Sequence, residues 1–171
     1  MNYRYTLLKT NTLYSGFNQL HEYELKFMQF DGNQSPVIRR ELFYRNPCVG
    51  LIPYDPVSKE IILIEQIRIG MIANMSADLQ EINSQSTQDI QSPWMYEIIA
   101  GIIDPRENKD TNKENAILRE SKEEANCEIK KLIPIYEYYM TPGCSNETIS
   151  LYCGITDTSR KKTGEICGVE N

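Results

Sequence analysis

The sequence predicts an α+β fold with a mixed sheet and one main helix. Short apolar runs of strand length occur before and after a single stretch with helical periodicity. The 171 residues, of which 40% are hydrophobic and 25% charged, can supply the core of one globular domain. The order of strands, one helix and further strands favours α+β over an alternating α/β arrangement.

The N-terminal extension, residues 1–43, predicts an antiparallel β unit. Tyr23, Leu25 and Phe27 alternate with charged residues, and the turn residues 31–33 precede a possible returning strand at 36–43. So small a ribbon has little core of its own, and we expect it to pack on the main domain or on a second subunit. We therefore expect a homodimer in which this extension is exchanged or shared.

The main domain, residues 44–171, begins with two continuous apolar runs typical of strands that are buried on both faces. The strands expected in this domain are 48–53, 60–67, 94–103, 132–140 and 148–155. Residues 74–93 are polar and rich in Ser, Gln and Asn, which predicts an exposed insertion. The polar tail, 156–171, predicts neither a strand nor a helix of useful length.

Composition excludes several classes of function. A net charge of −6 argues against binding to the nucleic-acid backbone, and a phosphate-bearing substrate would need local arginines or metal cations. The single histidine and the absence of a C-x2-C pair argue against a zinc site. The five cysteines, an odd number, argue against a disulfide framework. No segment has the length and apolarity of a membrane span or a leader. We therefore expect a soluble cytoplasmic protein.

The strongest helix signal covers residues 112–126. Asn112 can cap its start, Ile117, Leu118 and Ala125 share one face, and Asn126 suits a left-handed C-terminal position. These features predict a helix that packs one apolar stripe against the sheet.

Three glutamates of this helix, Glu120, Glu123 and Glu124, fall within roughly a 100° sector of one face. Carboxylates so close repel one another unless a positive group lies between them. One interpretation is a solvated acidic face with intrahelical pairs such as Arg119–Glu123. The other is a site for Mg²⁺ or Mn²⁺, which seek several carboxylate oxygens.

Residues 101–127 resemble the Nudix box, G-x5-E-x7-R-E-U-x-E-E-x-G-U, in which U is a bulky apolar residue. Gly101 and Glu107 have the right spacing, and Arg119 begins the match to the R-E-U-x-E-E core. The departures are an eleven-residue rather than a seven-residue spacing before Arg119, and three replacements: Ser121, Asn126 and Cys127. A longer loop need not move the helix, and Asn adopts left-handed backbone more readily than most residues.

Three longer blocks, 39–70, 93–104 and 138–147, resemble ADP-ribose pyrophosphatases of the Nudix superfamily. The resemblance implies a Nudix-type α/β/α sandwich with a mixed sheet and an N-terminal antiparallel β extension that helps to form the adenosine site across a homodimer. Relatives add a further strand and a helix after the segment matching 148–155. The tail does not predict them, so we expect the C-terminal helix to be missing.

The resemblance also implies metal ligands. Glu120 and Glu124 would hold Mg²⁺, or Mn²⁺, with Glu123 completing the cluster and the carbonyl of Ala100 as a further ligand. Arg119 would brace the loop by pairing with Glu107.

Other positions would contact the substrate or activate water. Arg40 and Arg68 are candidates for diphosphate or nucleotide contacts, although either could be an ordinary strand-edge charge. Glu147 matches a contact to the terminal ribose, and Glu170 is the closest match to a glutamate that positions water or a metal.

The implied reaction is Mg²⁺-dependent hydrolysis of ADP-ribose to AMP and ribose 5-phosphate. The alternatives are a pyrophosphatase for another nucleoside diphosphate sugar, such as GDP-mannose, and a catalytically weak or silent nucleotide-binding homologue. The loop insertion, Ser121 and the missing C-terminal elements predict a low turnover with metal binding better preserved.

Overall fold

The computed structural model describes residues 4–75, 92–103, 112–161 and 164. The chain divides into two compact units. The first contains Met1–Val49, Ile102–Ala116 and Ile135–Leu151, and the second contains Gly50–Gly101, Ile117–Pro134 and Tyr152–Asn171. Each unit is described by itself below.

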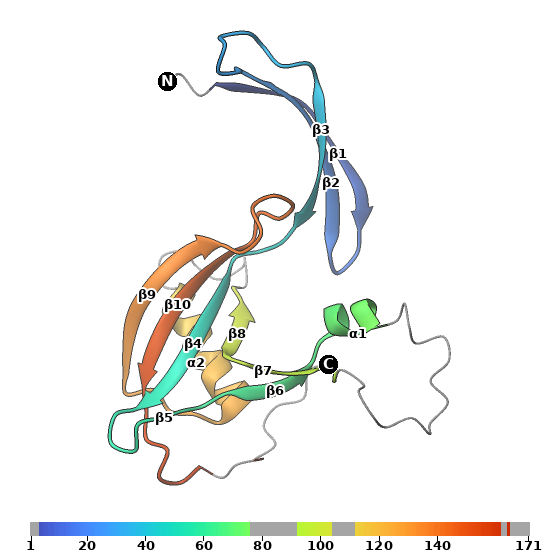
Figure 1. The fold of residues 1–171 in the computed structure, drawn as a ribbon. Helices are drawn as coiled ribbons and strands as arrows, with labels where there is room; N and C mark the ends of the chain where they lie inside the picture. Colours follow the sequence, from blue (N-terminus) through green and yellow to red (C-terminus); the bar gives the residue numbers. More distant parts are fainter. Residues whose placement is uncertain (1–3, 76–91, 104–111, 162–163, 165–171) are drawn as a thin grey trace, which may run out of the picture. The chain divides into compact units, whose positions relative to one another are not determined.

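In the first unit, an N-terminal sheet contains β1 (Tyr5–Ser15), β2 (Gln19–Phe27) and β3 (Ile38–Tyr44) in the order β1-β2-β3 (Figure 1). Both pairings are antiparallel, as the alternating pattern predicts. The turn before β3 is also present: Gly32 has a positive φ of 85°, and the Asn33 amide donates to Asp31 Oδ1 at 2.9 Å. Glycine suits this turn because it adopts positive φ without a steric cost.

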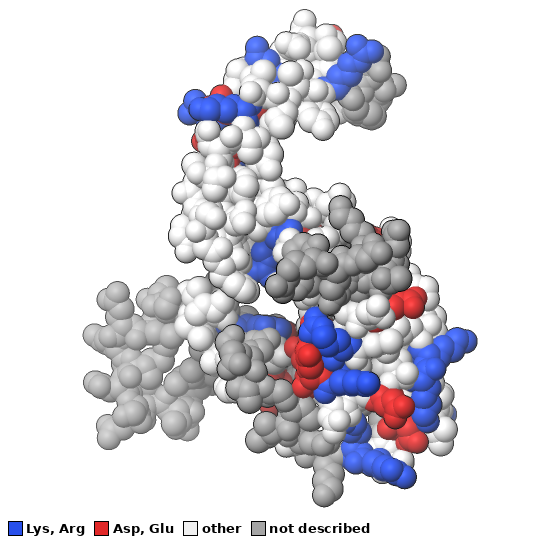
Figure 2. Space-filling model, turned by 180° about the vertical axis from the view of Figure 1, so that it is seen from behind, with Lys and Arg blue, Asp and Glu red and all other residues white. Residues whose placement is uncertain are grey.

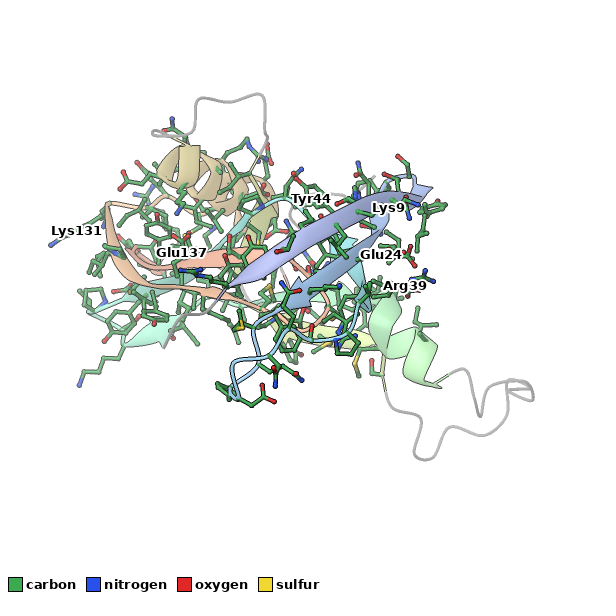
Figure 3. All side chains as sticks on the ribbon, turned by 90° about the horizontal axis from the view of Figure 1, so that it is seen from above. Lys9, Glu24, Arg39, Tyr44, Lys131 and Glu137 are labelled. Atoms are coloured by element: carbon green, nitrogen blue, oxygen red, sulfur yellow. The ribbon has the colours of Figure 1, made fainter. Side chains whose placement is uncertain are left out.

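The register makes the N-terminal sheet amphipathic. Lys9, Glu24 and Arg39 are direct cross-strand neighbours on one face (Figure 3), and Arg39 Nε lies 3.0 Å from Glu24 Oε1. One position along β2, Leu25 is opposite Leu7 and Ile38, so these apolar side chains share the other face. Leu7 is nonetheless 49% exposed. This sheet therefore has one charged and one apolar face.

A five-stranded sheet follows the order β5 (Glu60–Ile61), β4 (Cys48–Asp55), β10 (Thr148–Ile155) and β9 (Lys131–Tyr139), with β8 (Ile99–Ile102) also pairing with β4. In Figure 1, β4 and β10 run in the same direction and β9 runs opposite to them, so the sheet is mixed, as expected. The chain is thus a mixed α+β protein, with many strands and two helices among the described residues.

The core of the second unit forms around β4. Leu51, Ile99 and Ile117 have no exposed surface. A Cβ on Gly154 would lie 2.9 Å from both Leu51 Cδ1 and Ile129 Cδ1, which shows how closely this backbone is packed.

Two of the expected strands are divided. The run 60–67 forms β5 and then β6 (Ile64–Ile67), and β6 pairs with β7 (Trp94–Glu97) in a separate two-stranded sheet. The run 94–103 likewise forms β7 and β8. A continuous apolar run gives no sign of the residue at which a strand changes its pairing partner.

Helix α1 (Ile69–Met75) was not expected from the sequence. Of the predicted polar insertion at 74–93, residues 76–91 lie outside the described residues.

Helix α2 (Asn112–Ala125) confirms the predicted helix to within one residue. Asn126 has a positive φ of 44°, as its C-terminal position predicts, and the Lys161 ammonium donates to the carbonyls of Ala125 and Asn126 at 2.6 and 2.5 Å. Ser121, in the buried stripe, is only 1% exposed, and its hydroxyl hydrogen-bonds to the Leu118 carbonyl at 2.8 Å. The hydroxyl at this apolar position is therefore satisfied within the fold.

Within the tail, Thr156–Lys161 forms no strand or helix in the described residues. Asp55 holds this segment to the end of β4, accepting hydrogen bonds from the Thr158 amide at 2.9 Å and its hydroxyl at 3.0 Å. The Val57 amide donates to the second carboxylate oxygen at 2.8 Å. These donors lower the pKa of Asp55 to about 2. Among the described helices, none is long and apolar enough to span a membrane.

Candidate active site

The acidic face of α2 is neutralised in part by Arg119. One nitrogen of its guanidinium lies 2.6 Å from Glu123 Oε2, and the other lies 2.6 Å from Glu120 Oε1. Burial disfavours the charge of Arg119, but the two carboxylates outweigh it and raise the pKa of the guanidinium. The face seen in Figure 2 also shows acidic and basic side chains beside one another. The Arg119–Glu123 pair is the one expected of a solvated acidic helix.

Glu120 differs from Glu123 in its burial. The Glu120 side chain is 13% exposed, against 56% for Glu123. A Cβ on Gly101 would lie 2.0 Å from Glu120 Oε1 and 2.1 Å from its Cδ. The glycine therefore makes room for the Glu120 carboxylate against the backbone of β8, which a simple solvated face would not require.

Glu124 is fixed through both of its oxygens. The Gln66 side-chain amide of β6 donates to Oε1 at 3.0 Å, and the Ala100 backbone N–H of β8 donates to Oε2 at 3.1 Å. Two carboxylates of α2, Glu120 and Glu124, thus meet β8 at consecutive residues.

The donor set suits a hard divalent cation in its chemistry. Glu120, Glu124 and the Ala100 carbonyl offer oxygen ligands of the kind that Mg²⁺ binds. In the described parts of the chain, however, no group of three or more His, Cys, Asp or Glu side chains is arranged to hold an ion. Arg119 supplies the positive charge between Glu120 and Glu123 here, so a cation would compete with its guanidinium. Glu120 and Glu124 fit the role of metal ligands better than Glu123.

Arg68 is held by a residue that the sequence analysis did not single out. Its Nε and one terminal nitrogen donate to Glu97 Oε2 at 2.9 and 2.6 Å, with side-chain exposures of 37% and 24%. Gln66 was missed as well. No local signal singled it out, because its hydrogen-bond partner Glu124 lies 58 residues away along the chain.

Arg40 and Glu147 belong to the first unit. Arg40 is exposed and donates to the Arg39 carbonyl at 2.7 Å. Glu147 forms an ion pair with Arg45, whose Nε lies 3.3 Å from its Oε1. Asn146 ties the same loop to Arg45 through two hydrogen bonds between the Asn146 amide group and the Arg45 backbone, each 2.8 Å. The ribose-contact role of Glu147 stays a prediction.

Glu107 and Glu170 lie outside the described residues. The expected Arg119–Glu107 pair and the role of Glu170 in positioning water therefore stay predictions.

Comparison with known proteins gives several relatives along most of the chain. An ADP-ribose pyrophosphatase of Haemophilus influenzae is 34% identical over 156 residues, which cover 91% of this chain and 64% of that protein. An ADP-ribose pyrophosphatase of Escherichia coli K12 is 33% identical over 153 residues, covering 90% and 64%. A GDP-mannose pyrophosphatase of Yersinia pestis is 26% identical over 153 residues, covering 90% and 67%.

A solved structure described as an ADP compounds hydrolase matches the fold with a TM-score of 0.60 and 16% identity. The match covers 98% of this chain and 72% of that one. No family model matches the sequence. The chain spans 64% of the length of the ADP-ribose pyrophosphatases that it resembles. By its similarity along nine tenths of its residues, the chain is a homologue of the ADP-ribose pyrophosphatases.

Proposed function

We propose that this protein hydrolyses the diphosphate bond of a nucleoside diphosphate sugar, with ADP-ribose as the substrate and AMP and ribose 5-phosphate as the products. The observation that carries the proposal is the placement of Glu120 and Glu124 against Ala100 and Gly101 of β8. The names of the relatives, ADP-ribose pyrophosphatases at 33–34% identity, support the substrate class.

Glu120, Glu124 and the Ala100 carbonyl would hold Mg²⁺, or Mn²⁺ in its place. When bound, the cation would neutralise charge on the diphosphate and lower the pKa of water. Glu123, the most exposed carboxylate of the cluster, and Glu170 are the proposed acceptors of the proton from the attacking water.

Arg68 would bind a diphosphate oxygen through its guanidinium, which Glu97 already orients through two hydrogen bonds. In the first unit, Arg40 would contact the nucleotide, and Glu147, paired with Arg45, would contact the terminal ribose.

A second candidate is a nucleotide-binding homologue with little or no turnover. The specific observation in its favour is Arg119, which bridges Glu120 and Glu123 and so already binds one of the proposed cation ligands. A preference for GDP-mannose is the alternative within the same chemistry, and it is supported by the relatives of that name at 26% identity.

The test is AMP release from ADP-ribose by the purified chain at saturating Mg²⁺, with GDP-mannose and a chelator in parallel reactions. Glu124→Gln should lower turnover by more than about a hundredfold, because even outer partners of a metal ligand cost 10–100-fold. It should also remove most of the rise in melting temperature that Mg²⁺ causes. Glu128→Gln is the matched control, since Glu128 is exposed and lies just beyond the helix.

Each outcome separates the candidates. A metal-induced rise in melting temperature without turnover would favour the silent nucleotide-binding protein. A higher kcat/KM for GDP-mannose than for ADP-ribose would make GDP-mannose the proposed substrate in place of ADP-ribose. An unchanged metal-induced shift in Glu124→Gln would return the acidic helix to the interpretation of a solvated face.

A further inference from the structure

We propose that Gln66 is a positioning residue that fixes the Glu124 carboxylate for its ligand, an inference that rests on the function proposed above. Gln66 comes from β6 and Glu124 from α2, and they meet through the hydrogen bond from Gln66 Nε2 to Glu124 Oε1 at 3.0 Å. The Ala100 N–H holds the second oxygen at 3.1 Å. The two donors come from different strands, so together they fix both the position and the rotation of the carboxylate.

The other end of the same amide carries the second observation. Gln66 Oε1 is buried and has no hydrogen-bond partner, and it is the one such side-chain atom among the described residues. Buried acceptors are normally satisfied, so an exception calls for an explanation. Turning the amide over would bring its oxygen against the negatively charged Glu124. The amide therefore keeps its N–H₂ group on the carboxylate and leaves Oε1 unsatisfied.

This orientation favours function at the expense of stability. A fully satisfied or apolar side chain at position 66 would suit folding better, because an unpaired buried acceptor is destabilising. Partners of metal ligands act in this way: they orient the ligand, and their loss typically weakens metal affinity 10–100-fold. Glu123 offers a contrast on the same helix, since its carboxylate is bound by the neighbouring Arg119 and is largely exposed.

Gln66→Met tests the proposal, because methionine has nearly the same shape but lacks both the donor and the unsatisfied acceptor. Three results are expected. The melting temperature of the metal-free protein should stay unchanged or rise. Exchange of the Ala100 amide hydrogen, followed by NMR without metal, should become about fivefold faster, as for the loss of one hydrogen bond. Affinity for Mn²⁺, measured by titration without substrate, should fall about 10–100-fold.

A double-mutant cycle distinguishes positioning from a general effect on the fold. In the Glu124→Gln background, Gln66→Met should change Mn²⁺ affinity by less than about twofold, because the carboxylate that it positions is gone. Gln66→Glu, a second isosteric variant, should speed exchange at Ala100 at least as much, because two carboxylates would repel each other. Gln34→Leu, at an exposed position of the N-terminal extension, should change none of these quantities.

The proposal is overturned if Ala100 exchange is unchanged in both Gln66 variants, or if Gln66→Met lowers the melting temperature and Mn²⁺ affinity falls equally with and without Glu124. The exchange measurement needs neither metal nor turnover. If the protein does not hydrolyse ADP-ribose, the proposed function fails, but Ala100 exchange should still be faster in the Gln66 variants. Unchanged Ala100 exchange, in contrast, would refute the positioning role of Gln66.

Discussion

Strands β1 and β4 both carry large apolar side chains, yet their burial is opposite. Of the 11 residues of β1, ten are exposed and one is half-buried, whereas β4 buries six of its eight residues. β1 is the edge strand of a three-stranded sheet, while β4 lies between β5 and β10 and also pairs with β8. Burial is therefore set by the number of layers and neighbours around a strand and does not follow from its apolar content alone.

The difference indicates that the residues around β4 should stabilise the fold, whereas the N-terminal sheet should promote assembly. Folding of the second unit should depend on the buried side chains around β4, such as Leu51. On the apolar face of the N-terminal sheet, Tyr5 is 75% and Leu7 49% exposed. This face should contribute to stability only when a second subunit covers it.

The largest effect is expected in the core. Leu51→Ala should lower the free energy of unfolding by about 2–5 kcal/mol, because Leu51 has no exposed surface and the closely packed Gly154 region cannot collapse onto the space. Leu13→Ala in β1, where the leucine is 49% exposed, should cost less than about 0.5 kcal/mol. Urea unfolding of both variants gives the comparison. Equal losses would show that β1 is buried as deeply as β4 in solution.

The next effect concerns the predicted homodimer. Leu7→Asp places a charge on the apolar face of the N-terminal sheet and should raise the dimer dissociation constant at least about 30-fold, as for a hot-spot residue. Thr6→Asp is the control, because Thr6 is opposite Lys26 on the charged face. Sedimentation at micromolar concentration measures both. An intact chain that sediments as a monomer would refute the exchanged or shared extension.

A smaller, pH-dependent effect is expected at Asp55. Its folded pKa, about 2, lies below its ordinary value of 3.8, so its contribution to stability is present above pH 4 and is lost as the pH falls toward 2. Asp55→Asn should therefore lower the urea midpoint at pH 7, and the difference from the parent protein should shrink between pH 4 and pH 2. A difference that stays constant over that range would mean that carboxylate charge is not what holds Thr158.

The smallest effect is expected in the charged row of the N-terminal sheet. Arg39→Ala removes the ion pair with Glu24 but should cost only about 0.2–1 kcal/mol, because the Arg39 side chain is 70% exposed. Unfolding at low and high salt measures it, and the difference should decrease as salt increases. A larger, salt-independent loss would indicate that Arg39 is buried by a partner.

Local sequence was sufficient for features that depend on periodicity and turn chemistry. The helix over residues 112–125, the left-handed Asn126 and the antiparallel N-terminal sheet were predictable, because the signal for each (helical periodicity, a C-terminal Asn, strand alternation beside a turn) lies within a short stretch of sequence. The acidic positions Glu120, Glu123 and Glu124 were predictable for the same reason, since helical geometry places them on one face.

Tertiary structure alone decided which of these glutamates is held, and by what. Glu124 is fixed by Gln66 and the Ala100 amide, which are separated from it by 58 and 24 residues, and Glu120 fits only because Gly101 lacks a side chain. The change of pairing partner between β5 and β6 brings Gln66 to this position, and the apolar run 60–67 contains no sequence signal for it. The physical reason is that strand pairing and side-chain burial depend on distant segments, whereas helix and turn signals are local.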